Sequence, residues 1–310
     1  MMKKYKHLAG RALAVLLVGL IVTPLYAQLP NHLRDYPLAS RRTTGDVIAP
    51  MFNGWIANED GSVTMVFAFA NTNSEEIVDI PLGENNYIEP AQFDGVQPTH
   101  FPTYNRFGFT GMQERGIFAV TVPADMAGTE IVWTLAHAGH SYSIPGRATS
   151  TAYEMSSSPR AEGSLNPGVR FSQGGPEGSG REGIWASRVT ASVGTPVTLS
   201  AYVQDRGERD QYGVGPFFHV GTEWIKHQGP VGAVPDFEQA QISGRQRARA
   251  AGEDGATTTN AWTEVTTQAT FPEPGDYVVR LRIDNFTAPD SQFDNQCCWS
   301  NAYVPVTVTP

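Results

Sequence analysis

Cysteine is nearly absent from this sequence, which has only two in 310 residues. The two, Cys297 and Cys298, are neighbours, so they cannot form the usual disulfide between two sheets, because both leave the backbone at one point. Three outcomes remain in an oxidising compartment: a bond between the two neighbours, bridges to other chains, or two free thiols. We expect the bond between neighbours, which would stiffen the loop of residues 284–301. A redox or metal role is the less favoured alternative, because no histidine is close in sequence.

Motifs of catalysis are missing as well. The sequence has no His-Glu-x-x-His, no Gly-x-Ser-x-Gly and no dinucleotide-binding fingerprint. His137 and His140 have a spacing that a metal could use, but no third ligand accompanies them, so we expect solvent-facing turn residues. We therefore predict a protein that is not an enzyme and that needs no cofactor.

Long apolar runs are absent beyond the first 27 residues, and residues 1–27 have the pattern of a secretory signal peptide. The positive region of that pattern consists of Lys3, Lys4, Lys6 and Arg11. The apolar run that follows, residues 12–22, is shorter than the roughly 20 residues needed to span a bilayer. We expect cleavage ahead of Gln28 rather than retention as a membrane anchor. The mature protein would then have no membrane span and would be periplasmic or secreted.

Basic residues are the minority charge. The chain has 22 Lys and Arg, and the loss of four with the signal leaves 18 against 31 Asp and Glu, a net charge near −13. This charge argues against nucleic acid or an anionic membrane as the main partner.

The sequence is rich in signals for β-structure. It has 31 glycines, 22 prolines and short runs in which large apolar residues alternate with others, which predicts an all-β fold. In one such run Val63, Met65, Phe67 and Phe69 share a face. The mature length suits two domains of ordinary size. The expected division is a signal peptide (1–27), a lead-in segment (28–45), a β-sandwich domain of unknown family (46–147), a Gly-, Ser- and Pro-rich linker (148–183) and a second β-sandwich domain (184–310).

The predicted second domain carries the most informative patterns. They are Val193-Gly194-x-Pro196-Val197-x-Leu199-x-Ala201, a mid-domain Trp224, Pro274-Gly275-Asp276-Tyr277-x-Val279-x-Leu281 and the terminal Val304-x-Val306-x-Val308. These residues resemble the PKD family of extracellular immunoglobulin-like domains. The resemblance implies an immunoglobulin-like sandwich in which Trp224 packs across the core and Tyr277 forms a tyrosine corner with nearby backbone. The family's Trp-Asp-Phe-Gly-Asp-Gly signature is replaced by Trp224-Ile225-Lys226-His227-Gln228-Gly229, so a related immunoglobulin-like subtype is an equal alternative.

One group of candidate ligand-binding residues is an aromatic and basic run that we expect to form a loop between strands. Its members are Tyr104, Arg106, Phe107, Phe109 and Arg115. Aromatic side chains on loops can stack on sugar rings or on peptide side chains, and the alternative is that they fold back as a lid over the sandwich.

A second group is Arg245, Arg247 and Arg249, which would share one face of an extended segment. In so acidic a chain, such a basic ridge could meet a sulfated or carboxylated polymer, and a solvated loop is the alternative.

A calcium site is a further candidate. Asp284, Asp290 and Asp294 supply hard oxygen atoms in the loop of the two cysteines, as Ca²⁺ requires. Their spacing fits no fixed calcium loop, and aspartate also suits turns for local reasons, so turn formation is the favoured interpretation and calcium binding the alternative.

These features predict a secreted or periplasmic, non-catalytic binding protein that mediates protein–protein interaction or assembly at the cell envelope. Two alternatives stay open: a carbohydrate-binding accessory protein, and an enzyme whose site lies in the first domain, for which no family is recognised. Surface aromatics in a flat row would favour a polysaccharide, and a deep pocket with convergent Asp, Glu or His would favour an enzyme. An exposed apolar patch or an open sheet edge would favour a protein partner.

Overall fold

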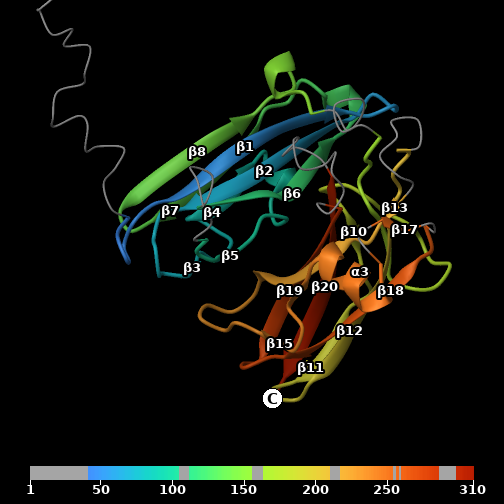
Figure 1. The fold of residues 1–310 in the computed structure, drawn as a ribbon. Coiled ribbons are helices and arrows are strands. Elements are labelled where there is room, and N and C mark those ends of the chain that lie inside the picture. The colour runs from blue at the N-terminus through green and yellow to red at the C-terminus, as the bar shows by residue number, and fades with distance from the viewer. Residues whose placement is uncertain are drawn as a thin grey trace, which may run out of the picture. The chain divides into compact units, whose positions relative to one another are not determined.

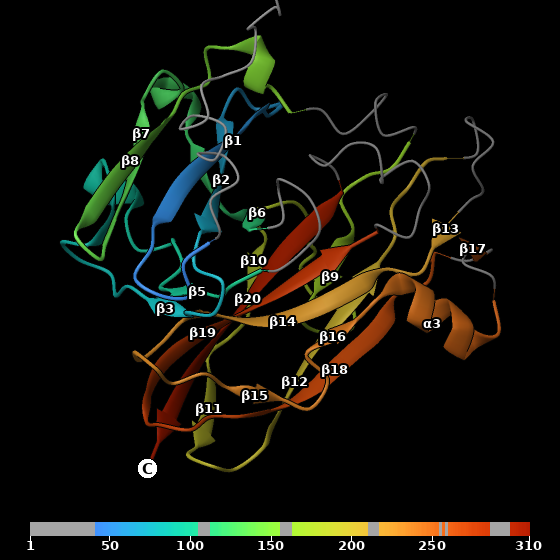
Figure 2. The same ribbon diagram turned by 60° about the vertical axis from the view of Figure 1, so that its left-hand side comes forward.

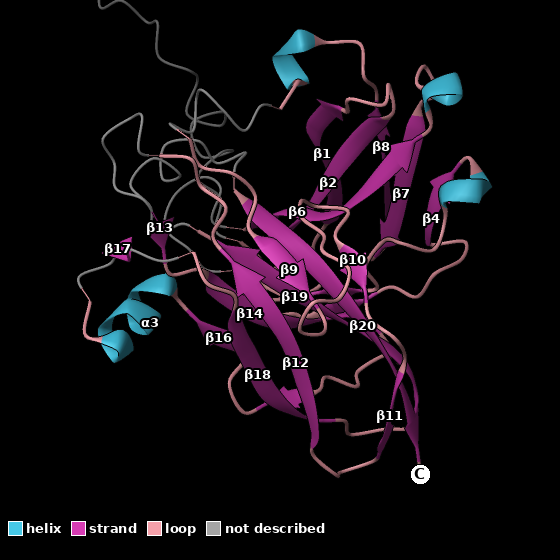
Figure 3. Ribbon diagram, turned by 90° about the vertical axis from the view of Figure 1, so that its right-hand side faces the viewer, coloured by secondary structure: helices cyan, strands magenta, loops and turns pink. Residues whose placement is uncertain are grey.

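Two β-sandwiches account for most of the described chain (Figures 1 and 2). The computed structural model describes residues 41–104, 112–155, 163–209, 217–253, 256–257, 260–285 and 298–310. Residues 42–310 form one unit, and both sandwiches belong to it. Figure 3 shows that strands make up nearly all of its regular structure, so the predicted all-β sandwich fold is confirmed.

The first sandwich packs a sheet of order β1-β2-β6 on a sheet of order β4-β7-β8. The strands of the former are β1 (Ile48–Ala57), β2 (Val63–Asn71) and β6 (Gln113–Val122). Those of the latter are β4 (Asn86–Glu89), β7 (Ile131–His137) and β8 (His140–Gly146). The connections contain a short ladder of β3 (Val78–Asp79) with β5 (His100–Phe101) and the 3₁₀ turns η2 (Ala91–Phe93), η3 (Ala124–Met126) and η4 (Thr151–Tyr153).

The predicted alternation along β2 is confirmed. Its large apolar side chains on one face enter the core between the sheets, where the ring of Phe67 stacks on Phe118 with centroids 5.1 Å apart. Trp133 of β7 packs edge-on against both rings. The opposite face of β2 is buried as well, because Val66 packs with Met155 beyond the end of β8. A strand covered on both faces has a neighbour on its outer side, which alternation alone does not predict.

The second sandwich has a sheet of order β10-β20-β19-β14-β16, with β11 also paired to β20, and a sheet of order β15-β18-β12-β9. The strands of the former are β10 (Ile184–Trp185), β11 (Val189–Ser192), β14 (Gly221–Gln228), β16 (Gln241–Ile242), β19 (Gly275–Asp284) and β20 (Trp299–Thr309). Those of the latter are β9 (Gly168–Arg170), β12 (Val197–Gln204), β15 (Asp236–Phe237) and β18 (Thr263–Thr270). A separate ladder pairs β13 (Phe217–Phe218) with β17 (Ala256–Thr257).

The core of the second sandwich contains the residues on which the sequence pattern rests. Trp224 of β14 is buried among side chains of both sheets, as predicted. The hydroxyl of Tyr277 donates a hydrogen bond of 2.9 Å to the carbonyl of Glu273, so the predicted tyrosine corner is confirmed. The ring of Tyr277 also packs on Phe271, with centroids 4.9 Å apart.

A short helix, α3 (Gly244–Ala251), occupies the segment for which we assumed an extended conformation, and that assumption is wrong. Ser243 and Gln246 form a capping box at its start, and Gly252 ends it in the left-handed conformation at φ 76°. Successive residues of a helix lie about 100° apart, so positions 245, 247 and 249 do not share one face. The predicted ridge of Arg245, Arg247 and Arg249 is therefore not formed.

The segment predicted to be a linker contains ordered contacts. Val169 of β9 pairs with Val203 of β12 and exchanges two backbone hydrogen bonds with Gly178. Arg181 is buried, and its carbonyl accepts a hydrogen bond of 2.8 Å from the side chain of Asn301. Part of the predicted linker, including Val169 and Arg181, is thus packed, whereas residues 149–154 are exposed. The domain boundaries stay a prediction.

Candidate functional site

The outer face of β19 and β20 is both polar and buried. Side chains alternate along the two strands, so Leu281 and Val304 enter the second core while Arg280, Arg282 and Asn301 lie on the other side. All three polar residues are nonetheless buried. Arg280, Arg282 and Asn301 each contact a residue of the first sandwich, so this face joins the two sandwiches.

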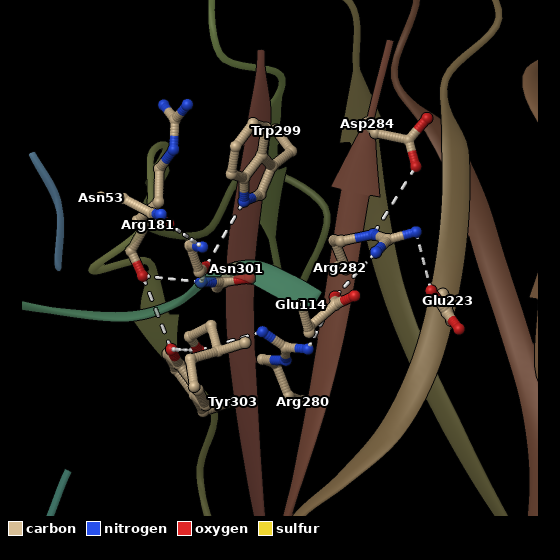
Figure 4. A network of polar contacts seen from close by, with 12 residues as sticks. Asn53, Glu114, Arg181, Glu223, Arg280, Arg282, Asp284, Trp299, Asn301 and Tyr303 are labelled. Atoms are coloured by element: carbon tan, nitrogen blue, oxygen red, sulfur yellow. Dashed lines mark hydrogen bonds and ion pairs between the residues drawn. The ribbon is translucent and has the colours of Figure 1, made fainter. Parts of the chain in front are cut away.

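A buried carboxylate forms the centre of this junction (Figure 4). Glu114 of β6 is 1% exposed, and its Oε1 atom accepts hydrogen bonds from Arg282 Nη1 at 2.8 Å and Arg280 Nη2 at 3.4 Å. Arg280 also donates to the carbonyl of Ile117 at 3.0 Å. The two buried guanidinium groups therefore depend on one carboxylate and one carbonyl of the first sandwich.

Arg282 has further acidic partners in its own sandwich. Its Nη2 lies 2.8 Å from Glu223 Oε2, and its Nε lies 3.8 Å from Asp284 Oδ2. Burial alone would lower the pKa of Arg282, but Glu114 and Glu223 raise it above the ordinary value of a guanidinium. Arg282 therefore stays charged in the junction.

Gly116 allows the two sandwiches to approach closely at this point. Its φ is 55°, and a Cβ atom there would lie 2.4 Å from a ring carbon of Trp299, so no larger residue fits. The carbonyl of Gly116 accepts hydrogen bonds from Asn301 Nδ2 at 2.9 Å and from Trp299 Nε1 at 3.4 Å.

A second polar cluster joins the sandwiches at Asp79 of β3. Its Oδ1 lies 2.7 Å from His100 Nδ1, while Oδ2 accepts hydrogen bonds from Lys226 Nζ at 3.1 Å and from the backbone N–H of Gly232 at 2.7 Å. Lys226 also donates to the carbonyl of Pro230 at 2.7 Å. Burial alone would raise the pKa of Asp79, but the hydrogen bonds from His100 and Gly232 and the charge of Lys226 lower it below its usual value. The ionised carboxylate holds the loop of residues 229–235 on the first sandwich.

His227 of β14 is another buried contact between the two sandwiches. Its Nε2 lies 2.8 Å from the carbonyl of Val96, and its ring packs on Tyr303 with centroids 5.0 Å apart. Burial, together with the charge of Arg280, lowers the pKa of His227 to about 3. The imidazole is therefore neutral at physiological pH and donates Nε2–H to the carbonyl.

Exposed aliphatic side chains lie on both chain segments that the Asp79–Gly232 hydrogen bond joins. Four of them lie within three residues of one of its two ends, and we call them the aliphatic patch. They are Ile77 (53% exposed), Leu82 (41%), Val231 (61%) and Val234 (45%). Among the described residues, the other large apolar side chains that are exposed are Tyr142, Tyr153 and Trp185, which lie on three separate elements.

A cavity of about 180 Å³, which we call the Trp185 cavity, lies between β6 of the first sandwich and the β10–β20 pair of the second. Trp185 is 49% exposed and stacks on the buried ring of Tyr303 at a centroid distance of 4.7 Å. Phe93, the last residue of η2, also lines the cavity, together with Asp94 and Val96, which follow η2 in the chain.

The predicted aromatic and basic loop is only partly within the described residues. Tyr104 packs against the first core, 6.3 Å from the ring of Phe69, and burial raises the pKa of its phenol above the ordinary value. Arg115 instead lines a different cavity, of about 280 Å³, beside Tyr153. Arg106, Phe107 and Phe109 lie outside the described residues. Tyr104 and Arg115 are thus not brought to one cavity, and the role proposed for this loop in ligand binding stays a prediction.

Of the three arginines of α3, Arg247 lies apart from the other two. Arg247 is half-buried and donates from Nη2 to the hydroxyl of Thr222 at 2.8 Å, and burial lowers its pKa. Arg245 and Arg249 are exposed. Arg247 therefore ties the helix to β14.

The loop of the two cysteines is described only at its ends. Asp284 closes β19 and pairs with Arg282, while Asp290 and Asp294 lie outside the described residues, so calcium binding stays a prediction. Cys298 is buried and disulfide-bonded. Cys297 lies outside the described residues, so the bond between the two neighbours also stays a prediction.

The described part of the chain has no candidate metal cluster and no membrane-spanning helix. No group of three or more His, Cys, Asp or Glu within it has a geometry suited to a metal ion. None of its helices is long and apolar enough to cross a bilayer. His140 is exposed at the tip of the β7–β8 hairpin and His137 is half-buried 3.9 Å from Glu76.

Comparison with known proteins gives no family. No family model matches the chain, and no curated protein matches it. Domains 4 and 5 of the S-layer protein SbsC align with 59% of this chain and 66% of their own, at 9% identity and a TM-score of 0.25. The D0-D1 domain of intimin aligns with 84% of this chain and 97% of its own, at 8% identity and a TM-score of 0.25. A chain from the complex of Dpr2 Ig1-Ig2 with DIP-Theta Ig1-Ig3 aligns with 84% and 99%, at 10% identity and a TM-score of 0.22. Similarity this low assigns neither a family nor a function, and the PKD resemblance stays a prediction.

Proposed function

We propose that this chain is an exported, non-catalytic binding protein that contacts a protein partner at the cell envelope through the aliphatic patch. The proposal rests on one observation, the presence of four exposed aliphatic side chains on the two segments that the Asp79–Gly232 hydrogen bond joins. Single exposed apolar residues are normal on a protein surface, whereas a group of them marks a contact site.

The patch supplies part of the free energy of binding. Complete burial of an aliphatic side chain contributes about 1.5–3 kcal/mol, so covering the exposed half of each contributes about 1 kcal/mol. Four such side chains together supply about 4 kcal/mol, which is the size of a binding hot spot.

The patch is also held in place before any partner arrives. Asp79 fixes both chain segments that carry the aliphatic patch. Asp79 itself lies between Ile77 and Leu82, and its carboxylate bonds the loop that contains Val231 and Val234. Lys226 and His100 are buried around the same carboxylate. Binding therefore costs little further loss of conformational entropy in these loops.

A polysaccharide partner would be favoured by a flat row of exposed aromatic rings. The exposed Tyr142, Tyr153 and Trp185 lie on β8, η4 and β10, which do not belong to one sheet. The grouping of aliphatic side chains supports a protein partner more directly.

The test compares two double variants of the tagged mature protein. Ile77→Ser with Val231→Ser removes the most exposed half of the patch, and Tyr142→Ser with Tyr153→Ser removes a similar exposed apolar area elsewhere. Each is cross-linked in cells of the source organism, purified and quantified by mass spectrometry. We expect the partner to be lost from the first variant and kept by the second. Equal recovery of the same partner by both variants would contradict the proposal.

A further inference from the structure

The Trp185 cavity has a rigid aromatic wall. Trp185 pairs through its backbone with Tyr303 in the parallel β10–β20 ladder, and their rings stack at an interplanar angle of 21°. Tyr303 is itself fixed by a hydrogen bond of 3.2 Å from its hydroxyl to the carbonyl of Ile117. The half-exposed indole is therefore a fixed platform beside the cavity.

The cavity is also acidic. Its ten lining residues include the carboxylates of Asp94 and Glu182 and no lysine, arginine or histidine. Glu182 Oε2 accepts a hydrogen bond of 2.6 Å from the hydroxyl of Thr121, and Asp94 Oδ1 accepts one of 2.9 Å from the backbone N–H of Ile88. These bonds orient the two carboxylates from different elements. His227, which lies behind Tyr303, adds no positive charge because its imidazole is neutral.

Most of the remaining lining residues are apolar, with Phe93, Val96 and Val120 among them, and Gln92 adds a neutral polar side chain. The volume of about 180 Å³ is below the roughly 300–1,000 Å³ of pockets that enclose a whole small-molecule ligand. The cavity thus suits a single long side chain, with apolar walls for an aliphatic stem and negative charge for a cationic end.

We propose that the Trp185 cavity binds the side chain of a lysine or arginine residue of a protein partner. The cation would lie over the indole of Trp185, where the ring quadrupole attracts it, and would pair with Glu182 and Asp94. The strongly acidic chain would steer a basic partner toward this surface. This inference rests on the proposed function, because it takes the basic side chain to belong to a protein partner.

Nα-acetyl-lysine methylamide tests the chemistry of the cavity without any partner protein. The chain has six tryptophans, so the indole N–H signals of ¹⁵N-labelled protein are few, and Trp185→Phe identifies that of Trp185. We expect this signal to shift with a dissociation constant on the order of 1 mM and the affinity to fall as salt is added. The Nε-acetylated analogue, which has no charge, should not shift it.

Two variants and a matched control complete the experiment. Glu182→Gln keeps an oxygen for Thr121 and removes the charge, so we expect an affinity loss of about tenfold. Trp185→Ala should abolish saturable shifts of the other lining residues. Glu264→Gln, an exposed substitution on β18, should leave the titration unchanged.

Three results would overturn the inference: no shift up to 20-fold above the expected dissociation constant (about 20 mM ligand), equal shifts with the acetylated analogue, or saturable binding of methyl glucoside in place of lysine. The proposed function can fail separately. If lysine titrates as expected but the aliphatic-patch variant retains every cross-linked partner, the cavity assignment stands and the patch assignment fails.

Discussion

Glu114→Gln should destabilise the protein far more than an ordinary surface substitution. Glu114 is 1% exposed and accepts from both Arg280 and Arg282, so the change leaves two buried guanidinium groups short of one negative charge. Removing one partner of a buried ion pair costs about 3–5 kcal/mol, because the remaining charge is desolvated without compensation. The amide oxygen still accepts one hydrogen bond and Arg282 keeps Glu223, so we expect the lower end, about 3 kcal/mol.

Urea denaturation followed by tryptophan fluorescence measures this loss, and Glu130→Gln is the matched control. Glu130 pairs with Arg147 at the surface, where the two side chains are 38% and 60% exposed, so its loss should cost no more than about 1 kcal/mol. Midpoint and slope are compared for both variants, since a changed slope would report altered cooperativity between the sandwiches. If the two variants differ by less than about 0.5 kcal/mol, the junction does not depend on Glu114 as argued.

Three further predictions concern the corner, acid and the cysteines. Tyr277→Phe removes the hydrogen bond to Glu273 and should cost about 1 kcal/mol, whereas an unchanged denaturation midpoint at unchanged slope would count against the corner. The pKa of His227 is lowered to about 3 in the folded protein from 6.5, so acid favours the unfolded chain below pH 6.5 and removes about 2 kcal/mol by pH 5. His227→Gln, which keeps a donor for Val96, should reduce that pH dependence, and an identical slope in the variant would refute the assignment. If Cys297 and Cys298 bond to each other, the exported protein should run as a monomer on non-reducing gels and react with alkylating reagent only after reduction, and a disulfide-linked dimer would contradict this.

The strands with period-two alternation could be predicted from the sequence, whereas the residues that cover the outer faces of these strands could not. Along β19, Val279, Leu281 and Ile283 alternate with Arg280 and Arg282, which is the pattern of a strand with one wet face. The same alternation describes a face buried against a polar partner, because paired charges can be buried as well as solvated. The partner, Glu114, is 166 residues from Arg280 in the chain, and no spacing rule connects them.

The helix α3 was not predicted, and the linker prediction for residues 148–183 was incomplete. The capping signals of α3 were present, since Ser243 precedes Gln246 by three residues and Gly252 follows the helix. The arginine-rich interior offered only a small apolar face, so no helical period was recognised. The glycine-rich stretch before β10 was interpreted as a linker because of its composition. Gly183 is instead required for close packing, because a Cβ atom at this position would clash with the carbonyl oxygen of Asn301.

The aliphatic patch and the Trp185 cavity could not be predicted either, because each is formed by residues that are far apart in the sequence. Ile77 and Val231 are unremarkable in sequence, and their segments meet only in the folded chain, where Asp79 bonds both Gly232 and Lys226. Trp185 stands alone in a glycine-containing stretch, and its role depends on Tyr303 at the other end of the domain.

Site-specific photo-cross-linking at position 231 tests the central claim most directly. A benzophenone side chain replaces Val231 in the full exported chain, and the same group replaces Tyr142 in a control with a comparable exposed apolar side chain. Irradiation of intact cells should give a discrete protein adduct from position 231 that disappears when Ile77 is also changed to Ser. Position 142 should not give that adduct. No adduct from position 231, or the same adduct from both positions, would contradict a partner-binding role for the aliphatic patch.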